Sequence, residues 1–378
     1  MSATDIAMRA WAYLSRVAEP PNTELAALVG RVGPVEAAER VRRGAVGSDL
    51  ARQTEARRAI DVAADDLELI ARCGARLITP DDAEWPVLAF AAFGGAAAAE
   101  RPDCRPPLAL WALGPARLNE VAERATAIVG TRAATAYGEL VAADLAGGLA
   151  ERDVAVVSGG AYGIDGAAHR AALAATGTTV AVLAGGIDIT YPAGHSALLH
   201  RIGNHGLLVT EYPPGVRPAR HRFLTRNRLV AVLAGATVVV EAGLRSGAAN
   251  TAAWARRLGR PVAAVPGPVT SAASLGCHVL LRGGAELVTR VDEVVELAGR
   301  VGELATAPPR PVTPLDGLSI AERQVYEALP GRGVLTVDQI SVAAGLAPPQ
   351  VLGPLAMLEV AGLVARRDGS WGIVRPKR

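Results

Sequence analysis

Thr126-Ala127-Ile128-Val129-Gly130-Thr131-Arg132 is a short apolar run that ends in a glycine turn. Val154-Ala155-Val156-Val157-Ser158-Gly159-Gly160 repeats the pattern, and the helix-like stretch Tyr137–Ala150 lies between them. Both runs are rich in β-branched residues and lack polar alternation, which is typical of strands buried on both faces. A strand, a helix and a second strand of this kind predict a parallel βαβ unit.

The same rhythm extends in both directions along the chain. A second helix-like stretch covers Ala248–Leu258. The alternation predicts an α/β fold with a doubly wound, mainly parallel sheet. The further strand candidates are Leu108–Leu113, Thr179–Leu183, Leu207–Thr210, Thr237–Val240 and Val262–Val265.

The regions outside the sheet predict a helical domain before it and a small domain after it. Residues 1–76 show helical spacing of apolar residues, for example at Ile6, Ala10 and Leu14, and predict an N-terminal helical domain. The sheet domain is expected over 77–299, with a Gly- and Pro-rich loop at 94–107.

Residues 300–314 contain four prolines and predict a stiff linker. Residues 315–378 then show three short helix-like stretches, Ile320–Leu329, Val337–Ala344 and Pro349–Val360, followed by a hairpin-like segment around Trp371. This order predicts a winged helix.

The overall composition excludes some classes of function but does not identify one. The formal net charge is only +2, so a nucleic-acid site would need a local basic surface. The three cysteines are far apart and have no metal-ligand spacing, which favours a reducing compartment and a cytoplasmic location. The apolar runs are broken well before the ~18 residues that a membrane-spanning helix needs, so no membrane partner is expected.

Three turns follow predicted strands and are candidate phosphate sites. They are Gly130-Thr131-Arg132, Ser158-Gly159-Gly160 and Ser246-Gly247. Carboxyl ends of parallel strands meet at one edge of a sheet, glycine admits a close phosphate, and a following helix start offers free N–H groups. The alternative is that these glycines only allow tight packing between strand and helix.

The strongest local feature is the basic stretch Arg217-Pro-Ala-Arg220-His-Arg222-Phe223-Leu-Thr-Arg226-Asn227-Arg228. It carries five arginines and no acid. We expect Arg132, Arg220, Arg226 and Arg228 to bind phosphates and Phe223 to stack a base, with Asn227 and Arg228 opening a helix. The alternative is a basic surface loop with Phe223 in the core.

No catalytic residue, metal site or cofactor is expected. The only lysine is Lys377, so a Walker-type phosphate loop is excluded. Ser158 takes the place of the first glycine of a dinucleotide fingerprint and has no partners in triad order. His195, His200 and His205 are five residues apart, which does not place them on one helix face.

An ordered series of motifs resembles the conserved domain of the DNA-processing protein A family, also called Smf. It covers roughly residues 105–290. The chain departs from the usual pattern at His195, Leu224 and Thr225. The matching segments are Ala127–Arg132 with Tyr137-Gly138, Val157–Ala161, Gly163–Asp165 with His169, Gly185–Asp188 with Tyr191-Pro192, Thr210–Gly215, Arg226–Arg228, Val240–Ala242, Ser246-Gly247, Val265–Gly267 and Gly276-Cys277.

The resemblance implies an extended Rossmann-like domain, preceded by a helical domain of the SAM-like kind and followed by a winged helix. It implies a non-enzymatic protein that binds and protects single-stranded DNA, helps to load the RecA recombinase in natural transformation, and forms a homodimer. The site residues implied are Gly130, Thr131, Arg132, Ser158, Gly159, Gly160, Arg220, Phe223, Arg226, Asn227, Arg228, Ser246 and Gly247.

A different class of function stays open, a hydrolase of nucleoside monophosphates from a related Rossmann-like family. That family shows Pro-Gly-Gly-x-Gly-Thr with a downstream Glu, whereas this chain has only Pro266-Gly267-Pro268.

Overall fold

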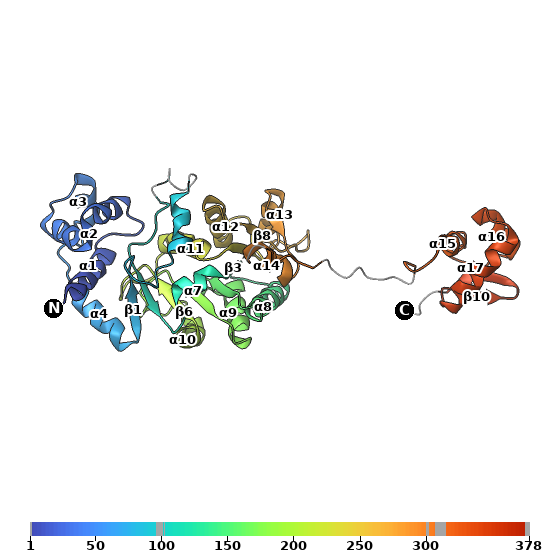
Figure 1. Cartoon of the computed structure of the whole chain (residues 1–378), viewed down its shortest axis with the longest axis horizontal. Coiled ribbons are helices and arrows are strands. Elements are labelled where there is room, and N and C mark those ends of the chain that lie inside the picture. Colours follow the sequence, from blue (N-terminus) through green and yellow to red (C-terminus); the bar gives the residue numbers. More distant parts are fainter. Residues whose placement is uncertain (1, 96–100, 102, 300–301, 307–314, 375–378) are drawn as a thin grey trace. The chain divides into compact units, whose positions relative to one another are not determined.

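The computed structural model describes residues 2–95, 101, 103–299, 302–306 and 315–374. The chain forms two compact units, Met1–Ala305 and Thr306–Arg378 (Figure 1). The four prolines of the predicted linker and part of the predicted loop at 94–107 lie outside the described residues.

Within the described residues, nine strands form one sheet in the order β1-β2-β6-β5-β4-β3-β7-β8-β9. The strands from β3 to β9 are parallel to one another, while β2 runs antiparallel to both β1 and β6. The predicted mainly parallel sheet is therefore confirmed. The strands are β1 (Ala75–Ile78), β2 (Leu110–Leu113), β3 (Ala125–Val129), β4 (Ala155–Ser158), β5 (Thr179–Val182), β6 (Leu207–Thr210), β7 (Ala236–Val239), β8 (Val262–Ala264) and β9 (Glu286–Leu287).

The sheet reverses its winding direction beside β3. From β3 the chain moves through β4 and β5 to β6, and then returns to place β7, β8 and β9 on the other side of β3. The loops that leave β3 and β7 therefore diverge at this switch point. In open α/β sheets, ligands bind at such a position.

Helices cover both faces of the sheet, as Figure 1 shows. On one face, α8 (Ala136–Ala150), α9 (Ile164–Ala174) and α14 (Val291–Ala298) share a core with Ile128, Val156 and Val238. On the other face, α11 (Arg220–Val232), α12 (Gly247–Arg257) and α13 (Leu275–Arg282) share a core with Val129, Val157 and Val239. Adjacent residues of a strand point to opposite faces, which explains the unbroken apolar runs.

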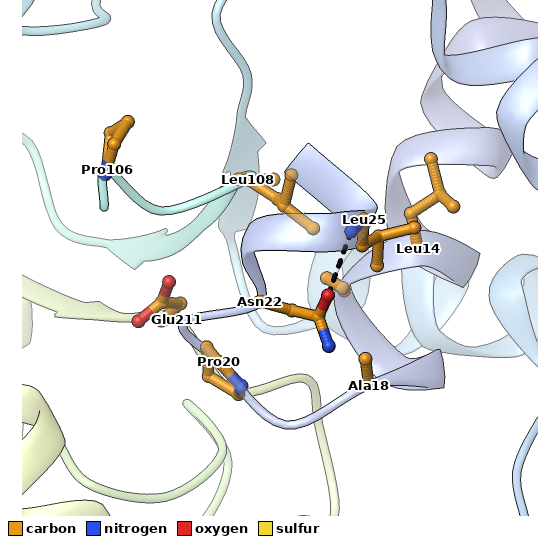
Figure 2. Close-up of a pocket in the computed structure, with 10 residues that line it drawn as sticks. Leu14, Ala18, Pro20, Asn22, Leu25, Pro106, Leu108 and Glu211 are labelled. Carbon is orange, nitrogen blue, oxygen red and sulfur yellow. Dashed lines mark hydrogen bonds between the residues drawn. The ribbon is translucent and has the colours of Figure 1, made fainter. Parts of the chain in front are cut away.

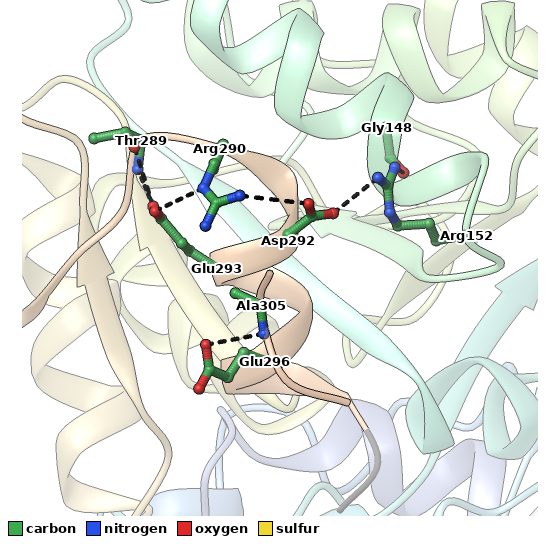
Figure 3. A network of polar contacts seen from close by, with 8 residues as sticks. All are labelled: Gly148, Arg152, Thr289, Arg290, Asp292, Glu293, Glu296 and Ala305. Carbon is green, nitrogen blue, oxygen red and sulfur yellow. Dashed lines mark hydrogen bonds and ion pairs between the residues drawn. The ribbon is translucent and has the colours of Figure 1, made fainter. Parts of the chain in front are cut away.

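Ion pairs fix the end of the first unit (Figure 3). Asp292 at the start of α14 pairs with Arg152, which follows α8, at 2.8 Å. Glu303 accepts from Arg124 at 2.8 Å, and the Ala305 N–H donates to Glu296 at 3.3 Å. The compact first unit therefore includes Ala305.

Four helices fill the first part of the chain, as predicted: α1 (Ala3–Val17), α2 (Thr23–Arg43), α3 (Ser48–Thr54) and α4 (Ala63–Arg72). Their core continues into the sheet, because Leu14 and Leu25 belong to one cluster with Trp111 and Leu208. Figure 2 shows this junction, where a cavity of about 10 Å³ is lined by Leu14, Leu25 and Leu108. Glu211 also lines this cavity.

The second unit has the elements of a winged helix, as predicted. Its helices are α15 (Ile320–Glu327), α16 (Val337–Ala344) and α17 (Pro348–Val360), and its hairpin joins β10 (Val364–Arg367) to β11 (Ser370–Ile373). Asp368 and Gly369 both have positive φ, the backbone that a two-residue hairpin turn requires. Leu335 pairs with Trp371 and adds a third chain segment to the wing.

In the part of the chain that the structure describes, no single helix has both the length and the apolar composition of a membrane span. The helices α16 and α17 meet that test only together, and the pair is bent by 103°.

A chain that ends after Ala305 is expected to fold with the stability of the first unit in the full chain. The reason is that the contacts described above, including those of Glu303 and Ala305, stay within it. Differential scanning calorimetry should show a Tm within about 2–4 °C of the matching transition in the full chain, the shift that ~1 kcal/mol produces. A larger fall would show that the first unit depends on residues after Ala305.

Candidate functional site

An open groove of about 740 Å³ lies at the switch point of the sheet. It is bordered by the turn after β3, the start of α11 and the turn before α12. The structure thus brings together three of the predicted features. The predicted site residues that line the groove are Gly130, Thr131, Arg132, Arg220, Phe223, Arg226, Asn227, Ser246 and Gly247.

The turn after β3 is held tightly in place. The Thr131 N–H donates to the Glu241 carbonyl at 2.7 Å, and the Thr131 carbonyl accepts from Ile164 at 3.2 Å. A Cβ on Gly130 would lie 2.4 Å from the Ile164 side chain, so only glycine fits there. Glycine is therefore required by packing at this position, while Arg132 is exposed at the rim of the groove.

Glu241, which follows β7, fastens the next part of the same turn. Its buried carboxylate accepts from the Thr135 N–H at 2.9 Å and from the Thr135 hydroxyl at 2.7 Å. A Cβ on Gly138 would lie 2.2 Å from this carboxylate. Glu241 thus holds the start of α8 against β7, and it is not among the residues that line the groove.

Arg226 places a positive charge on the floor of the groove. Its side chain is buried, and Nη1 donates to the carbonyls of Gly159, at 2.8 Å, and Val182. Burial lowers the pKa of Arg226 to about 10, while the nearby Asp165 opposes this shift, so the guanidinium stays charged at neutral pH. Its Nε has no hydrogen-bond partner among the described residues.

Gly159 makes room for this guanidinium. A Cβ on Gly159 would lie 2.4 Å from Nη1 of Arg226. Asp165 completes the floor by accepting from the N–H groups of Gly159, at 3.1 Å, and Ala161, at 3.4 Å. Burial raises the pKa of the Asp165 carboxyl, and the positive charge of Arg226 acts against that rise.

The turn before α12 is also pre-formed. Ser246 caps this helix, because its hydroxyl accepts from the Ala249 N–H at 3.2 Å. The Asn227 side chain donates to the Gly247 carbonyl at 3.3 Å and to Asn250 Oδ1 at 3.1 Å. Asn227 therefore joins α11 to α12 at the wall of the groove.

Phe223 is half-buried at the groove and has two close neighbours. The guanidinium carbon of Arg132 lies 5.2 Å from its ring centroid, and the ring of Tyr191 lies 5.5 Å away, tilted by 50°. Both are within the range of direct contact with an aromatic ring.

Arg228 does not line the groove, where the sequence predicted that it would bind a phosphate. Its side chain is fully buried, and Nη2 donates to both carboxylate oxygens of Glu211 at 2.6 Å. The sequence predicted that a helix begins at Asn227, but α11 begins at Arg220. Arg226 and Arg228 are therefore 200° apart on one helix, so they face opposite sides.

Ser158, Gly159 and Gly160 also lie outside the groove lining. Ser158 is buried and donates to the Ile128 carbonyl at 2.6 Å, so it joins β4 to β3. Gly160 has a φ of 69°, which favours glycine, and its carbonyl lies 3.2 Å from the His195 ring. These residues therefore lie behind the groove lining, where Gly159 contacts the guanidinium of Arg226.

Sequence reasoning missed Arg245 and Tyr191, which both line the groove. Arg245 directly precedes the Ser246-Gly247 turn, so its charge beside a phosphate-type turn was a usable signal. In the sequence, Tyr191 stands out only as part of the Tyr191-Pro192 motif. Its place beside Phe223 depends on two distant loops meeting.

The lining of the groove is basic. Arg132, Arg220 and Arg245 are exposed, Arg226 lies on the floor, and Asp165 is the one acid among its lining residues. Among the described residues, no group of three His, Cys, Asp or Glu side chains could hold a metal ion.

The chain has a Rossmann-like sheet with a basic groove at its switch point and, in its second unit, a winged helix. Both parts match models of a class of DNA-processing proteins, the recombination mediators. Residues 76–299 match the family model described as DNA recombination-mediator protein A, and residues 307–370 match the DprA winged helix domain. The chain belongs to the DNA recombination-mediator protein A family, which confirms the resemblance.

Known relatives span most of this chain. It is 76% identical to a DNA processing protein DprA of Mycobacterium tuberculosis over 371 residues, 98% of this chain and 95% of the relative. It is 39% identical to Protein Smf of Escherichia coli over 256 residues, 67% of this chain and 68% of the relative.

Two solved structures have the same fold. The X-ray structure of DNA processing protein A from Streptococcus pneumoniae has a TM-score of 0.60 and 30% identity, and covers 73% of this chain and 92% of that one. DNA processing protein A from Helicobacter pylori, described for its single-stranded DNA binding mode, has a TM-score of 0.50 and 26% identity, and covers 58% and 94%.

Changing Arg228 to Leu is expected to destabilise the fold by ~3–5 kcal/mol, because it leaves the buried Glu211 carboxylate without its partner. The double change Arg228→Leu with Glu211→Leu should recover much of that loss, since no unpaired charge remains. Urea unfolding followed by circular dichroism measures both. A single variant as stable as the double variant would contradict the pairing.

Proposed function

We propose that this chain binds single-stranded DNA along the groove, without sequence preference, as a recombination mediator. The observation that carries the proposal is the set of four arginines around a groove that also exposes aromatic rings. The Helicobacter pylori relative, whose structure is described for its single-stranded DNA binding mode, supports the same ligand.

The arginines fit a phosphate backbone in two ways. Arg132, Arg220 and Arg245 are exposed and can follow a flexible strand along the rim. Arg226 is fixed by two carbonyls and can hold one phosphate at a defined place on the floor. Non-specific strand binding combines such a basic groove with rings on which bases stack.

The turns at the rim can add backbone contacts. Gly130, Ser246 and Gly247 line the groove next to helix or strand ends, where small residues allow a phosphate to approach the main chain. Thr131 lines it too, but its N–H already donates to the Glu241 carbonyl. Asn227 lies between them on α11. A duplex hides the faces of its bases, so aromatic contacts at this groove favour a single strand.

We further propose that the chain does no chemistry on nucleotides. The groups that a hydrolase could use are engaged elsewhere: the Ser158 hydroxyl donates to Ile128, and the Glu241 carboxylate accepts from Thr135. Neither residue lines the groove.

The cellular role that we propose is protection of single strands and loading of RecA, in the cytoplasm, by a homodimer. Membership of the DNA recombination-mediator protein A family supports this role.

The wild-type chain is expected to bind an oligo-dT strand more tightly than a duplex of equal length. Changing Arg132, Arg220 or Arg245 to Ala should weaken binding and reduce the slope of log K against log salt by about 0.7 per lost phosphate contact. Fluorescence anisotropy over a salt series measures affinity and slope together.

Arg31→Ala is the matched control, because Arg31 is exposed on α2 and does not line the groove. It should leave affinity and slope unchanged. Two results would contradict the proposal that the groove binds single-stranded DNA. One is equal affinity for duplex and single strand at moderate salt, and the other is a loss of affinity in Arg31→Ala as large as in the groove variants.

The RecA role predicts a kinetic effect. On DNA already covered by a single-strand-binding protein, the wild-type chain should shorten the lag before RecA hydrolyses ATP, because it gives RecA access to the strand. The double variant Arg132→Ala with Arg245→Ala should lose this effect in proportion to its loss of DNA affinity. An unchanged lag with the wild-type chain would count against RecA loading.

A further inference from the structure

The third helix of the winged-helix unit, α17, has no positive charge on it or near it in the sequence (Figure 1). Residues 333–365, which contain α16, α17 and the turn between them, include no Lys, Arg or His. In helix-turn-helix proteins that read DNA, this helix enters the major groove, and cations on the protein neutralise the phosphates. The helix α17 is therefore poorly suited to contact a duplex.

The outward side of α17 is apolar. Val351, Leu355 and Leu358 face the core of the unit and are buried. On the opposite side, Val360 is 85% exposed and Met357 is 57% exposed. The other exposed residues along this side are Pro349, Gly353 and Ala356. A helix that is apolar all round is typical of one that is covered on all sides, so this exposed side indicates an interaction surface.

The charged residues of α16 and α17 are both acids. They are Asp338 on α16 and Glu359 on α17, which adjoins Val360, and both are exposed. Neither carboxylate forms an ion pair or a side-chain hydrogen bond among the described residues. Exposed acids without a counter-ion repel a phosphate backbone and attract cationic groups. The surface therefore combines an apolar centre with unpaired negative charge.

We propose that the outward side of α17 binds an amphipathic helix of a partner protein, one whose apolar stripe is flanked by Lys or Arg. The apolar stripe packs on Val360 and Met357, and the cations meet Glu359. Gly353 and Ala356 have little or no side chain, so the axis of a second helix can approach closely. An amphipathic helix that lies on an apolar surface is a common mode of protein recognition. This role concerns the second unit alone and does not depend on what the groove of the first unit binds.

Two other occupants fit this surface less well. A second copy of α17 would bring acids to both sides of the contact, and α17 has no cation to pair with them. A bilayer with anionic headgroups would be repelled by the same acids. The helices α16 and α17 have the composition of a membrane span only together, and the bend of 103° between them interrupts it.

The test uses the full chain and two labelled peptides, and fluorescence anisotropy measures binding. One peptide is a helix with leucines along one face and lysines along the other, and the second has glutamates in place of the lysines. Val360→Asp removes the apolar contact. Ile320→Asp is the matched control, because Ile320 is 88% exposed on α15 of the same unit.

The wild-type chain should bind the lysine peptide more tightly than the glutamate peptide. Val360→Asp should weaken binding of the lysine peptide by roughly 10- to 150-fold, the loss of one buried aliphatic side chain, while Ile320→Asp binds normally. The double variant Asp338→Lys with Glu359→Lys should lose affinity for the lysine peptide and gain affinity for the glutamate peptide. A gain of affinity cannot come from misfolding.

The inference is overturned if the wild-type chain binds neither peptide, if Val360→Asp binds as the wild type does, or if Ile320→Asp shows an equal loss. Three further results would assign the surface to another occupant and overturn it as well. In Val360→Asp these are weaker binding of a DNA duplex, loss of flotation with phosphatidylcholine vesicles, and a smaller mass in sedimentation. They correspond to DNA, lipid and a second copy of the chain.

Discussion

The buried guanidinium of Arg226 is the contact on which the site depends. It joins the ends of β4 and β5 through the carbonyls of Gly159 and Val182, and so fixes how α11 lies on the sheet. Phe223, one turn earlier, then lines the groove. Arg228, on the opposite side of the helix, enters the core beside Glu211. One helix thus supplies both the charged floor of the groove and a buried ion pair.

Much of the sheet could be predicted from the sequence, because strands buried on both faces have an unmistakable composition. β1 and β9 were missed for physical reasons: Arg76 lies in one, and Glu286 and the exposed Leu287 form the other. The shared core of the helical region and the sheet could not be predicted either. It places Leu14 in one cluster with residues nearly two hundred positions away, such as Leu208.

The parts of the candidate site that could be predicted are those that a short stretch of sequence determines. Glycine turns after strands placed Gly130 and Ser246 at one edge of the sheet, as a parallel fold requires. The basic stretch was a weaker guide, since charge alone does not say which arginines are buried. That depended on where α11 begins, and a start at Arg220 instead of Asn227 moved Arg228 from the groove to the core.

The fit of Gly159 against Arg226 makes two distant positions of this chain depend on each other. The space that the guanidinium occupies exists only because residue 159 has no side chain. A larger residue there would displace the arginine, and a smaller residue at 226 would leave two strand-end carbonyls without this donor. The two residues therefore act as one unit, and any redesign of the groove floor has to treat them together.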